Sequence, residues 1–179
     1  MLRHYWRGGF IRNFLADSYV WLGLSRTRSY REWQLLEIME NFGLPTPRRV
    51  ALRIQRYGLF YRSDIVTEEI QNITSLAQLL QEREATEEEW YCVGQTIRRF
   101  HDKQIFHQDL NANNLLLGSG TCHLIDFDRG RIQAGDWWHE RVLNRLHRSL
   151  EKLKGKHNTF HFNAMSWSYL QDGYAQMSE

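Results

Sequence analysis

Two short stretches of this sequence hold polar side chains whose types and spacing suit phosphate chemistry. The first contains the carboxylate of Asp109 and, five residues later, the amide of Asn114, and the second places Asp126 after an apolar pair. A carboxylate can orient a hydroxyl group and take its proton, while amide and carboxylate oxygens are hard ligands that suit Mg²⁺. Together these groups could position a hydroxyl acceptor and hold a divalent metal ion on the phosphates of ATP.

The order of these residues follows a pattern with a mechanism. Residues 107–114 read His-Gln-Asp-Leu-Asn-Ala-Asn-Asn, and residues 124–127 read Leu-Ile-Asp-Phe. The pattern H-x-D-L-x-x-x-N, followed by two apolar residues and D-F, is typical of the catalytic loop and metal-binding segment of the protein-kinase-like fold. It predicts that Asp109 is the catalytic base and that Asn114 and Asp126 are metal ligands.

Chemistry alone leaves alternatives within the first stretch. Asp109 has no cationic residue close to it in the sequence, and a single loop aspartate often makes an Asx turn instead of doing catalysis. The amides of Asn111 and Asn113 could also serve as ligands, so the choice of Asn114 depends on the pattern.

Two further polar residues accompany the site. Asp128 is either a second metal ligand or the ion-pair partner of Arg129 or Arg131. His107 is expected to brace the loop by a hydrogen bond to backbone near Asp126, which is a structural role.

Histidines elsewhere offer a rival metal site. His101 ends the predicted helix before the loop, where a partly protonated imidazole suits the helix dipole. A zinc site formed by His101, His107, His157 and His161 is disfavoured.

Composition limits the class of protein. The 179 residues, 42% apolar and 25% charged, fit one globular domain or slightly more. Residues 1–62 contain eleven arginines against four acidic residues, which favours an anionic partner, although a solvated basic face is equally consistent. Cys92 and Cys122 are too few for a disulfide framework and are expected to be reduced core residues. We expect an intracellular protein, because neither a signal peptide nor a run of about 20 apolar residues is present.

Apolar periodicity, caps and turn residues predict the elements that position these groups. A helix is expected from Arg26 to Phe42, where the apolar residues recur at helical spacing before a glycine and two prolines. The other expected elements are strands at 50–56 and 59–70, helices at 75–84 and from the Thr86–Glu89 capping box onward, a hairpin at 115–125, and helices at 136–154 and 164–176. The first of the two strands should be half-buried, since Val50, Leu52 and Ile54 alternate.

This order of elements predicts an α+β, protein-kinase-like fold with two lobes. Residues 1–72 would form a partial N-terminal lobe of strands and one helix. Residues 73–179 would form a mostly helical C-terminal lobe with the catalytic loop and the metal-binding hairpin. Because only two residues precede Arg3, the N-terminal lobe is expected to lack its first strands and its glycine-rich loop, for which Gly8-Gly9 has the wrong spacing.

The chain also resembles the bacterial lipopolysaccharide core kinases, and most closely the 3-deoxy-D-manno-octulosonic acid (Kdo) kinases. The arginine-aromatic N-terminus and the motif Asp-Phe-Asp-Arg-Gly narrow the resemblance from kinase-like proteins to this family. The matching stretches are 2–9, 27–32, 43–47, 58–62, 106–114, 124–130 and 148–153.

The resemblance implies ATP and Mg²⁺ as cofactors, Asp109 as the base, and Asn114 and Asp126 as ligands. It also implies that Glu32 partners the cation that anchors the ATP phosphates. Kinases use a strand lysine there, but the first lysine of this chain is Lys103, so Arg3 occupies that place with different geometry.

The family also implies where the protein works and what it acts on. The acceptor would be a sugar hydroxyl of a Kdo–lipid A precursor. The protein would be peripheral at the cytoplasmic face of the bacterial inner membrane, against its anionic surface, and no nucleic acid partner is expected. If the 179 residues are the native length, weak ATP binding and slow turnover are expected.

Two other functions compete with this one. A small-molecule kinase of the aminoglycoside or choline type shares the motif, but the basic N-terminus favours an anionic acceptor. A non-catalytic scaffold could bind an anionic membrane surface through Arg3, Arg7, Arg12, Trp6, Phe10, Phe14 and Trp21. The aromatic residues Trp137, Trp138 and Trp167 either line a sugar site or fill the core, and core packing is favoured.

Overall fold

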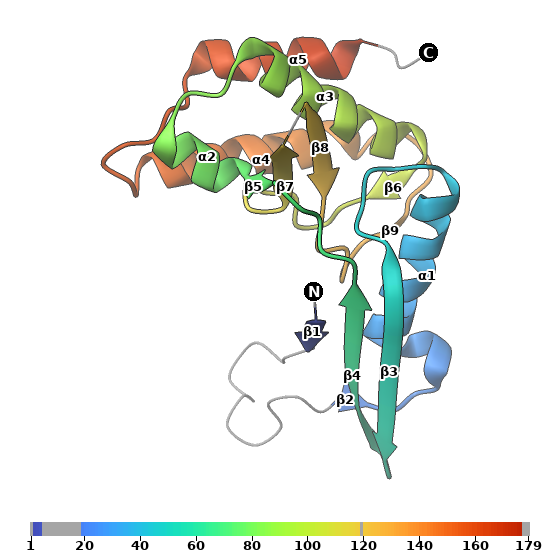
Figure 1. Ribbon diagram of the computed structural model, residues 1–179. Helices are drawn as coiled ribbons and strands as arrows, with labels where there is room; N and C mark the ends of the chain where they lie inside the picture. The colour runs from blue at the N-terminus through green and yellow to red at the C-terminus, as the bar shows by residue number, and fades with distance from the viewer. Residues whose placement is uncertain (1, 5–18, 119, 177–179) are drawn as a thin grey trace.

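The computed structural model describes residues 2–4, 19–118 and 120–176. In Figure 1 an antiparallel sheet with helix α1 beside it forms one end of the molecule, and helices α2 to α5 gather at the other end. The chain passes from the sheet to the helical part through residues 68–73. This arrangement confirms the predicted α+β class. Gly8-Gly9, Arg7 and Arg12 lie outside the described residues.

Strand β4 (Phe60–Thr67) lies at the centre of the larger sheet, which has four strands within the described ranges. Strand β3 (Arg49–Tyr57) pairs with one edge of β4, while β1 (Leu2–His4) and β2 (Tyr19–Val20) pair with successive parts of its other edge. The tight turn between β3 and β4 includes Gly58 at a φ of 57°, a backbone conformation that glycine adopts without strain. The expected pair of strands is therefore confirmed.

One detail of the predicted burial in β3 is wrong. Leu52 and Ile54 are half-buried as expected, but Val50 is 56% exposed. The register with β4 shifts between Arg49 and Ala51, so Val50 falls at a bulge. A bulge interrupts the alternation of a strand, and this one releases Val50 from the buried face.

Helix α1 (Arg28–Asn41) follows a short 3₁₀ turn at Leu24–Arg26 and packs against β3 and β4. Its end matches the predicted stop signal: Gly43 has a φ of 62°, and the N–H of Leu44 donates to the carbonyl of Met39 at 3.0 Å. The helix buries Leu35, Leu36 and Met39, together with one charged residue, Glu32.

The helical part contains α2 (Leu76–Glu82), α3 (Glu87–Asp102), α4 (His139–Lys154) and α5 (Ala164–Ala175). The predicted capping box opens α3. The N–H of Glu89 donates to the hydroxyl of Thr86 at 3.2 Å, and the N–H of Thr86 donates to the carboxylate of Glu89 at 2.9 Å. The helix that carries the chain to the catalytic loop thus begins at a locally encoded point.

Glycines bring α3 and α5 into close contact. A Cβ added at Gly94 would lie 2.1 Å from the carbonyl oxygen of Leu170, and one added at Gly173 would lie 2.4 Å from that of Tyr91. Any larger residue at either position would push the two helices apart.

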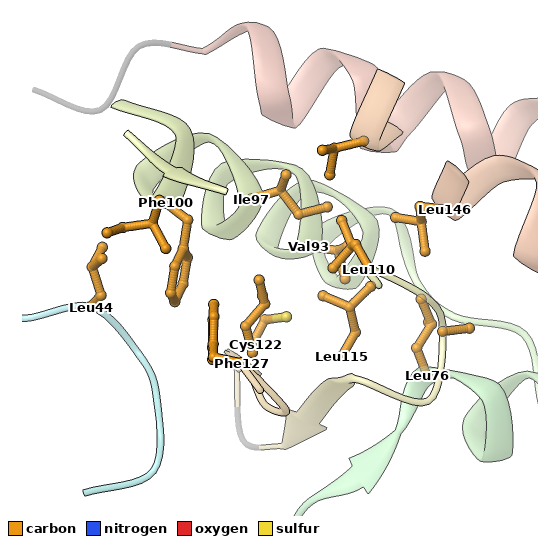
Figure 2. Packing of buried hydrophobic residues seen from close by; sticks show 14 of the residues in the cluster. Leu44, Leu76, Val93, Ile97, Phe100, Leu110, Leu115, Cys122, Phe127 and Leu146 are labelled. Carbon is orange, nitrogen blue, oxygen red and sulfur yellow. The ribbon is translucent and has the colours of Figure 1, made fainter. Parts of the chain in front are cut away.

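The main core of the helical part lies beneath α3. Figure 2 shows Ile97 and Phe100 of α3 pointing towards Leu115 and Phe127, all of them fully buried. The rings of Phe100 and Phe127 stack with their centroids 5.5 Å apart. Phe127 directly follows Asp126, so this stack anchors the segment that carries the second carboxylate motif.

Short strands hold the two motif segments side by side. Strand β7 (Leu115–Gly118) pairs with β8 (Thr121–Leu124) as the predicted hairpin, and β5 (Thr74–Ser75) pairs with the other edge of β7. A further pair, β6 (Ile105–Phe106) with β9 (Arg131–Ile132), was not predicted, because two-residue strands leave no periodic signal. The loop from β6 to β7 and the segment from β8 to β9 are therefore fixed at both ends.

The division at residues 72 and 73 stays a prediction about folding units. Strand β4 ends at Thr67 and β5 begins at Thr74, so the predicted boundary falls in the connection between them. Among the described residues, no helix is both long enough and apolar enough to cross a membrane.

Candidate active site

Backbone hydrogen bonds join the two motif segments. The N–H of Ile125 donates to the carbonyl of Asn114 at 3.0 Å, and the N–H of Leu124 donates to the carbonyl of Pro45 at 3.0 Å. The second bond ties the segment to the chain that leaves α1. The site is thus assembled from both ends of the molecule.

His107 braces the catalytic loop, as predicted. Its Nε2 lies 3.0 Å from the carbonyl oxygen of Ile125, and its Nδ1 accepts a hydrogen bond from the N–H of Asp109 at 3.2 Å. These partners require a neutral ring with its proton on Nε2. Burial lowers the pKa of His107, which favours that neutral form.

Asp109 has a cationic partner that its sequence neighbourhood does not reveal. Its carboxylate forms an ion pair with the guanidinium of Arg145, which lies in the second turn of α4. Although no cationic residue is close to Asp109 in the sequence, α4 brings in a positive charge from 36 residues away. Both side chains stay about half-exposed, so the pair can rearrange when a ligand enters.

Two asparagines of the loop donate to the same backbone carbonyl, that of Asp109. Asn111 donates from its amide to the carbonyl of Asp109 at 2.8 Å and accepts the N–H of Asn113 at 2.9 Å, so it shapes the turn. Asn114 is buried and donates from Nδ2 to the same carbonyl of Asp109 at 3.0 Å. With its nitrogen so engaged, Asn114 offers its amide oxygen as a possible ligand for a cation.

Asp126 lies just past the end of β8 in a left-handed conformation, with a φ of 68°. A residue other than glycine pays a steric cost there, so tertiary contacts must hold it. The stacked ring of Phe127 on one side and the β7–β8 hairpin on the other supply those contacts. The result is an exposed carboxylate at a fixed point.

A first cavity of about 390 Å³ lies between the sheet and the helical part. Its walls are largely apolar, and Asn114 and Asp126 contribute its polar lining together with Glu32 and the chain after β4. The lining residues are Glu32, Leu36, Thr46, Pro47, Ile65, Thr67, Glu68, Glu69, Ile70, Ile73, Asn114, Leu116, Ile125, Asp126 and Phe127. An apolar pocket of this size with a few convergent polar groups is typical of a small-molecule site.

A second cavity of about 400 Å³ adjoins the first and is almost wholly polar. Asp126 lines both cavities, whereas Asp109 and Arg145 line the second and not the first. Its full lining is Gln108, Asp109, Asp126, Asp128, Arg129, Gly130 and Arg145. The two carboxylates of the motif thus meet around one shared space.

Asp128 engages two arginines in ion pairs. One is Arg28 at the start of α1, and the other is Arg129, whose Nε lies 3.9 Å from the carboxylate. This arrangement agrees with the ion-pair interpretation of Asp128, although Arg131 is not the partner. The pair with Arg28 also connects the sheet end of the molecule to the motif segment.

The two residues expected to anchor phosphates lie near the first cavity. Glu32 is only 4% exposed and lines the cavity from α1. Arg3 lies in β1 directly opposite Ile65, which lines the same cavity from β4. The backbone positions are therefore compatible with a shared role, while the Arg3 side chain is outside what the structure describes.

Two expectations about ring residues have clear outcomes. His101 is not partly protonated: burial lowers its pKa to about 3, and its Nδ1 lies 2.7 Å from the hydroxyl of Tyr174. The core interpretation holds for Trp138, which is fully buried, and Trp167 packs against the same core. Trp137, by contrast, is 63% exposed.

Comparison with known proteins gives a consistent assignment. The profile of the lipopolysaccharide kinase (Kdo/WaaP) family matches residues 1–174. A 3-deoxy-D-manno-octulosonic acid kinase of Photobacterium profundum is 44% identical over 97% of this chain and 73% of its own length. A protein of the same name from Haemophilus influenzae is 42% identical over 98% of this chain and 75% of its own length.

A solved structure gives independent support for the fold. The structure described as WaaP in complex with acyl carrier protein superposes with a TM-score of 0.61 at 20% identity. The match covers 82% of this chain and 65% of that chain, so this chain spans just under two thirds of its length. Likeness at this identity concerns the fold, and it agrees with the predicted kinase-like architecture. Taken with the sequence matches, it means that this chain belongs to the lipopolysaccharide kinase (Kdo/WaaP) family.

Proposed function

We propose that this protein transfers the γ-phosphoryl group of ATP to a hydroxyl of a Kdo sugar on a Kdo–lipid A precursor, a step of lipopolysaccharide inner-core synthesis. The observation that carries the proposal is the junction of the two cavities at Asp126, with Asn114 in the first and Asp109 in the second. Phosphoryl transfer needs a donor and an acceptor in adjoining sites, with carboxylates at their boundary. The name shared by the relatives supplies the acceptor class.

The first cavity is the site proposed for ATP. Its apolar walls suit a purine ring, and Asn114 and Asp126 offer oxygen ligands at its polar end, so the residues present fit Mg²⁺. No cluster of three or more His, Cys, Asp or Glu side chains that could hold a metal occurs in the described part of the chain. Mg²⁺ does not need one, because it commonly uses one or two protein ligands with phosphates and water. Asn114 and Asp126 would hold the ion, which would supply neutralisation of charge on the phosphate oxygens.

Arg3 and Glu32 are proposed to secure the phosphates from the sheet side. A buried carboxylate such as Glu32 is costly unless a cation is close to it. An arginine at the position of Arg3 would supply that cation and hold phosphate oxygens with its planar fork. The buried carboxylate of Glu32 in α1 would then serve to hold the cation that binds the phosphates.

Asp109 performs the proton chemistry in the second cavity. It accepts a hydrogen bond from the acceptor hydroxyl and aims the oxygen at phosphorus. It takes the proton as the new O–P bond forms and the bond from the γ-phosphorus to the leaving ADP breaks. His107 fixes the backbone of Asp109 by accepting its N–H, and Arg145 holds the carboxylate from α4. Each of these contacts restricts where the reacting oxygen can lie.

The chemistry of the acceptor also indicates where in the cell the protein works. A Kdo–lipid A precursor is a membrane lipid, so the enzyme must approach an anionic bilayer, and ATP is on the cytoplasmic side. We therefore place the protein peripherally at the cytoplasmic face of the inner membrane. The arginine-rich residues 1–62 favour such a surface electrostatically.

The substitution Asp109→Asn tests this function. It keeps the size of the side chain but removes the base, so kcat for phosphate transfer to Kdo–lipid A should fall by about 10²- to 10⁴-fold. Transfer of labelled phosphate from ATP to the lipid gives the rate, and thermal unfolding confirms that the fold is intact. Asp102→Asn is the matched control, because Asp102 pairs with Arg98 on α3 and lines neither cavity.

The outcome separates the competing functions. A scaffold predicts that wild-type protein has no transfer activity at all, and an aminoglycoside or choline kinase predicts transfer to those compounds but not to Kdo–lipid A. Wild-type turnover by Asp109→Asn would remove Asp109 from the chemistry.

A further inference from the structure

A third cavity, of about 390 Å³, lies beside the second and is strongly basic. Among the described residues its charged lining consists of arginines alone, with no carboxylate. We call it the arginine groove, and its lining residues are Phe106, Gln108, Arg131, Arg141, Val142, Arg145 and Arg148. A concave surface lined by charges of one sign concentrates the field and attracts ions of the opposite sign.

The arginines come from two elements that the fold holds together. Arg141, Arg145 and Arg148 recur at spacings of four and three along α4, so they share one side of the helix. Arg131 reaches the groove from β9, where it lies opposite Phe106 of β6 in the strand pair. The cluster therefore depends on tertiary structure and is not a run of charges in sequence.

Aromatic rings hold two of these guanidinium groups in place. Arg131 lies over the ring of Phe106 at 4.3 Å from the centroid, and Arg141 lies 5.6 Å from the same ring and 5.2 Å from that of Trp137. Stacking on a ring restrains a guanidinium and leaves its edge N–H groups free to bind. The groove thus resembles a prepared site more than a set of mobile surface side chains.

The groove arginines also differ from others in the molecule in their partners. Arg28, Arg49, Arg83 and Arg98 each pair with a carboxylate. Within the described ranges, Arg131, Arg141 and Arg148 have no acidic group at ion-pair distance, and the side chain of Arg131 donates to the amide oxygen of Gln133 instead. Placing like charges together without counter-charges costs free energy, which a bound anion would recover.

The position of the groove indicates which ligand carries the anionic group that binds there. Gln108 and Arg145 line both the groove and the second cavity, so the groove opens beside Asp109. An anionic group there would belong to the molecule whose hydroxyl faces Asp109. We propose that the arginine groove binds a carboxylate or phosphate group of the acceptor and so fixes which hydroxyl is presented for transfer. This inference rests on the proposed function.

The double substitution Arg141→Gln/Arg148→Gln tests the groove, because neither residue touches Asp109. The KM for Kdo–lipid A should rise by about ten- to 100-fold, as expected when charge-assisted hydrogen bonds are lost, while kcat and the KM for ATP change less than about threefold. Arg83→Gln/Arg98→Gln is the matched control, since it removes two positive charges elsewhere. An acceptor KM within twofold of wild type in the groove variant would overturn the proposal.

Modified acceptors identify the anionic group. Kdo–lipid A with its sugar carboxylate amidated, and Kdo–lipid A with its phosphates removed, are compared on wild-type protein and on the groove variant. The modification that removes the true ligand raises the KM of wild type but adds no further loss in the variant. If both modifications add their full effect to that of the variant, the groove does not bind the acceptor.

A direct binding measurement separates failure of the groove from failure of the proposed function. Titration of the intact protein with Kdo–lipid A in neutral detergent gives the affinity without turnover, so it applies even if no transfer is detected. At least tenfold weaker binding by the groove variant supports the proposal, and equal binding overturns it. Equal weakening towards anionic vesicles that lack Kdo would assign the groove to the bilayer surface and would also overturn it.

Discussion

The two adjoining cavities of this molecule are built on different principles. The first lies between sheet and helices, and its charged and amide residues Glu32 and Asn114 are buried among apolar walls. The second is open and polar, and ion pairs such as that of Asp109 with Arg145 cross it. The first cavity therefore selects a ligand mainly by shape and apolar burial. The second relies on charged side chains that can leave their ion-pair partners and bind a ligand instead.

This difference has a physical reason. Backbone pairing and a packed core fix the groups of the first cavity, so a ligand meets them already in place. Exposed ion pairs contribute little to folding, so the second cavity can exchange an internal partner for an acceptor at low cost. The proposed donor is the same molecule in every cycle, so a preformed cavity such as the first suits it. The proposed acceptor is a charged lipid, so a cavity whose ion pairs can exchange partners, such as the second, suits it.

Asp126 belongs to both cavities, and its substitution should have a larger effect than that of Glu32 or Arg145. Asp126→Asn removes a negative charge, and a proposed metal ligand, at the boundary between the two cavities, so we expect kcat to fall by about 10³-fold. Steady-state kinetics at saturating Mg²⁺ and both substrates measures the fall. Asp128→Asn is the matched control, because Asp128 lines only the second cavity and is already paired with Arg28.

The two variants can break the comparison as well as sharpen it. If Asp126→Asn left kcat unchanged and raised only the acceptor KM, the shared boundary would have no role in holding the donor. The cavity proposed for ATP would then need another metal ligand.

Glu32→Gln should have the next largest effect and should act on the donor alone. The substitution removes a buried charge from the first cavity, so the KM for ATP should rise by about ten- to 100-fold with the acceptor KM unchanged. ATP titrations at fixed acceptor concentration measure this change. Glu37→Gln, on the same helix, is the control, because Glu37 is half-exposed and its pair with Arg49 contributes little. An equal change in both variants would remove Glu32 from the nucleotide site.

Local signals in the sequence predicted most of the fold. The capping box at Thr86, the glycine stop after α1 and the hairpin at 115–125 each depend on a few neighbouring residues, and all three occur in the structure. The family and the kinase-like architecture followed from motifs in a fixed order, and both are confirmed. Elements without a local signal were missed: β6 and β9 exist only because they pair with each other.

The site shows the same limit. His107 was predicted to brace the loop because it lies within the motif, and its contact with Ile125 confirms this. Arg145 was missed, because its partner Asp109 is 36 residues away and contact between them depends on how α4 packs. The spacing of Arg141, Arg145 and Arg148 on one side of a predicted helix was a signal that could have revealed it. The roles of Arg3, Glu32, Asp109, Asn114 and Asp126 stay predictions until the variants are measured.

Arg145→Gln should have the smallest effect and should separate positioning from anion binding. Arg145 lines both the second cavity and the arginine groove, so its loss should raise the acceptor KM and also lower kcat. The fall in kcat should be only about two- to fivefold, because a half-exposed ion pair contributes less than about 1 kcal/mol. Initial rates across acceptor concentrations measure both parameters.

Arg145→Lys provides the matched comparison for the last variant. A lysine keeps the charge that holds Asp109 but loses the planar fork, so kcat should recover towards wild type while the acceptor KM stays raised. If Arg145→Gln changes only the acceptor KM, as is expected for Arg141→Gln/Arg148→Gln, then Arg145 serves the groove and does not position the base. If Arg145→Gln changes only kcat, Arg145 positions the carboxylate of Asp109 and does not bind the acceptor anion. Arg141 and Arg148 would then bind that anion without Arg145.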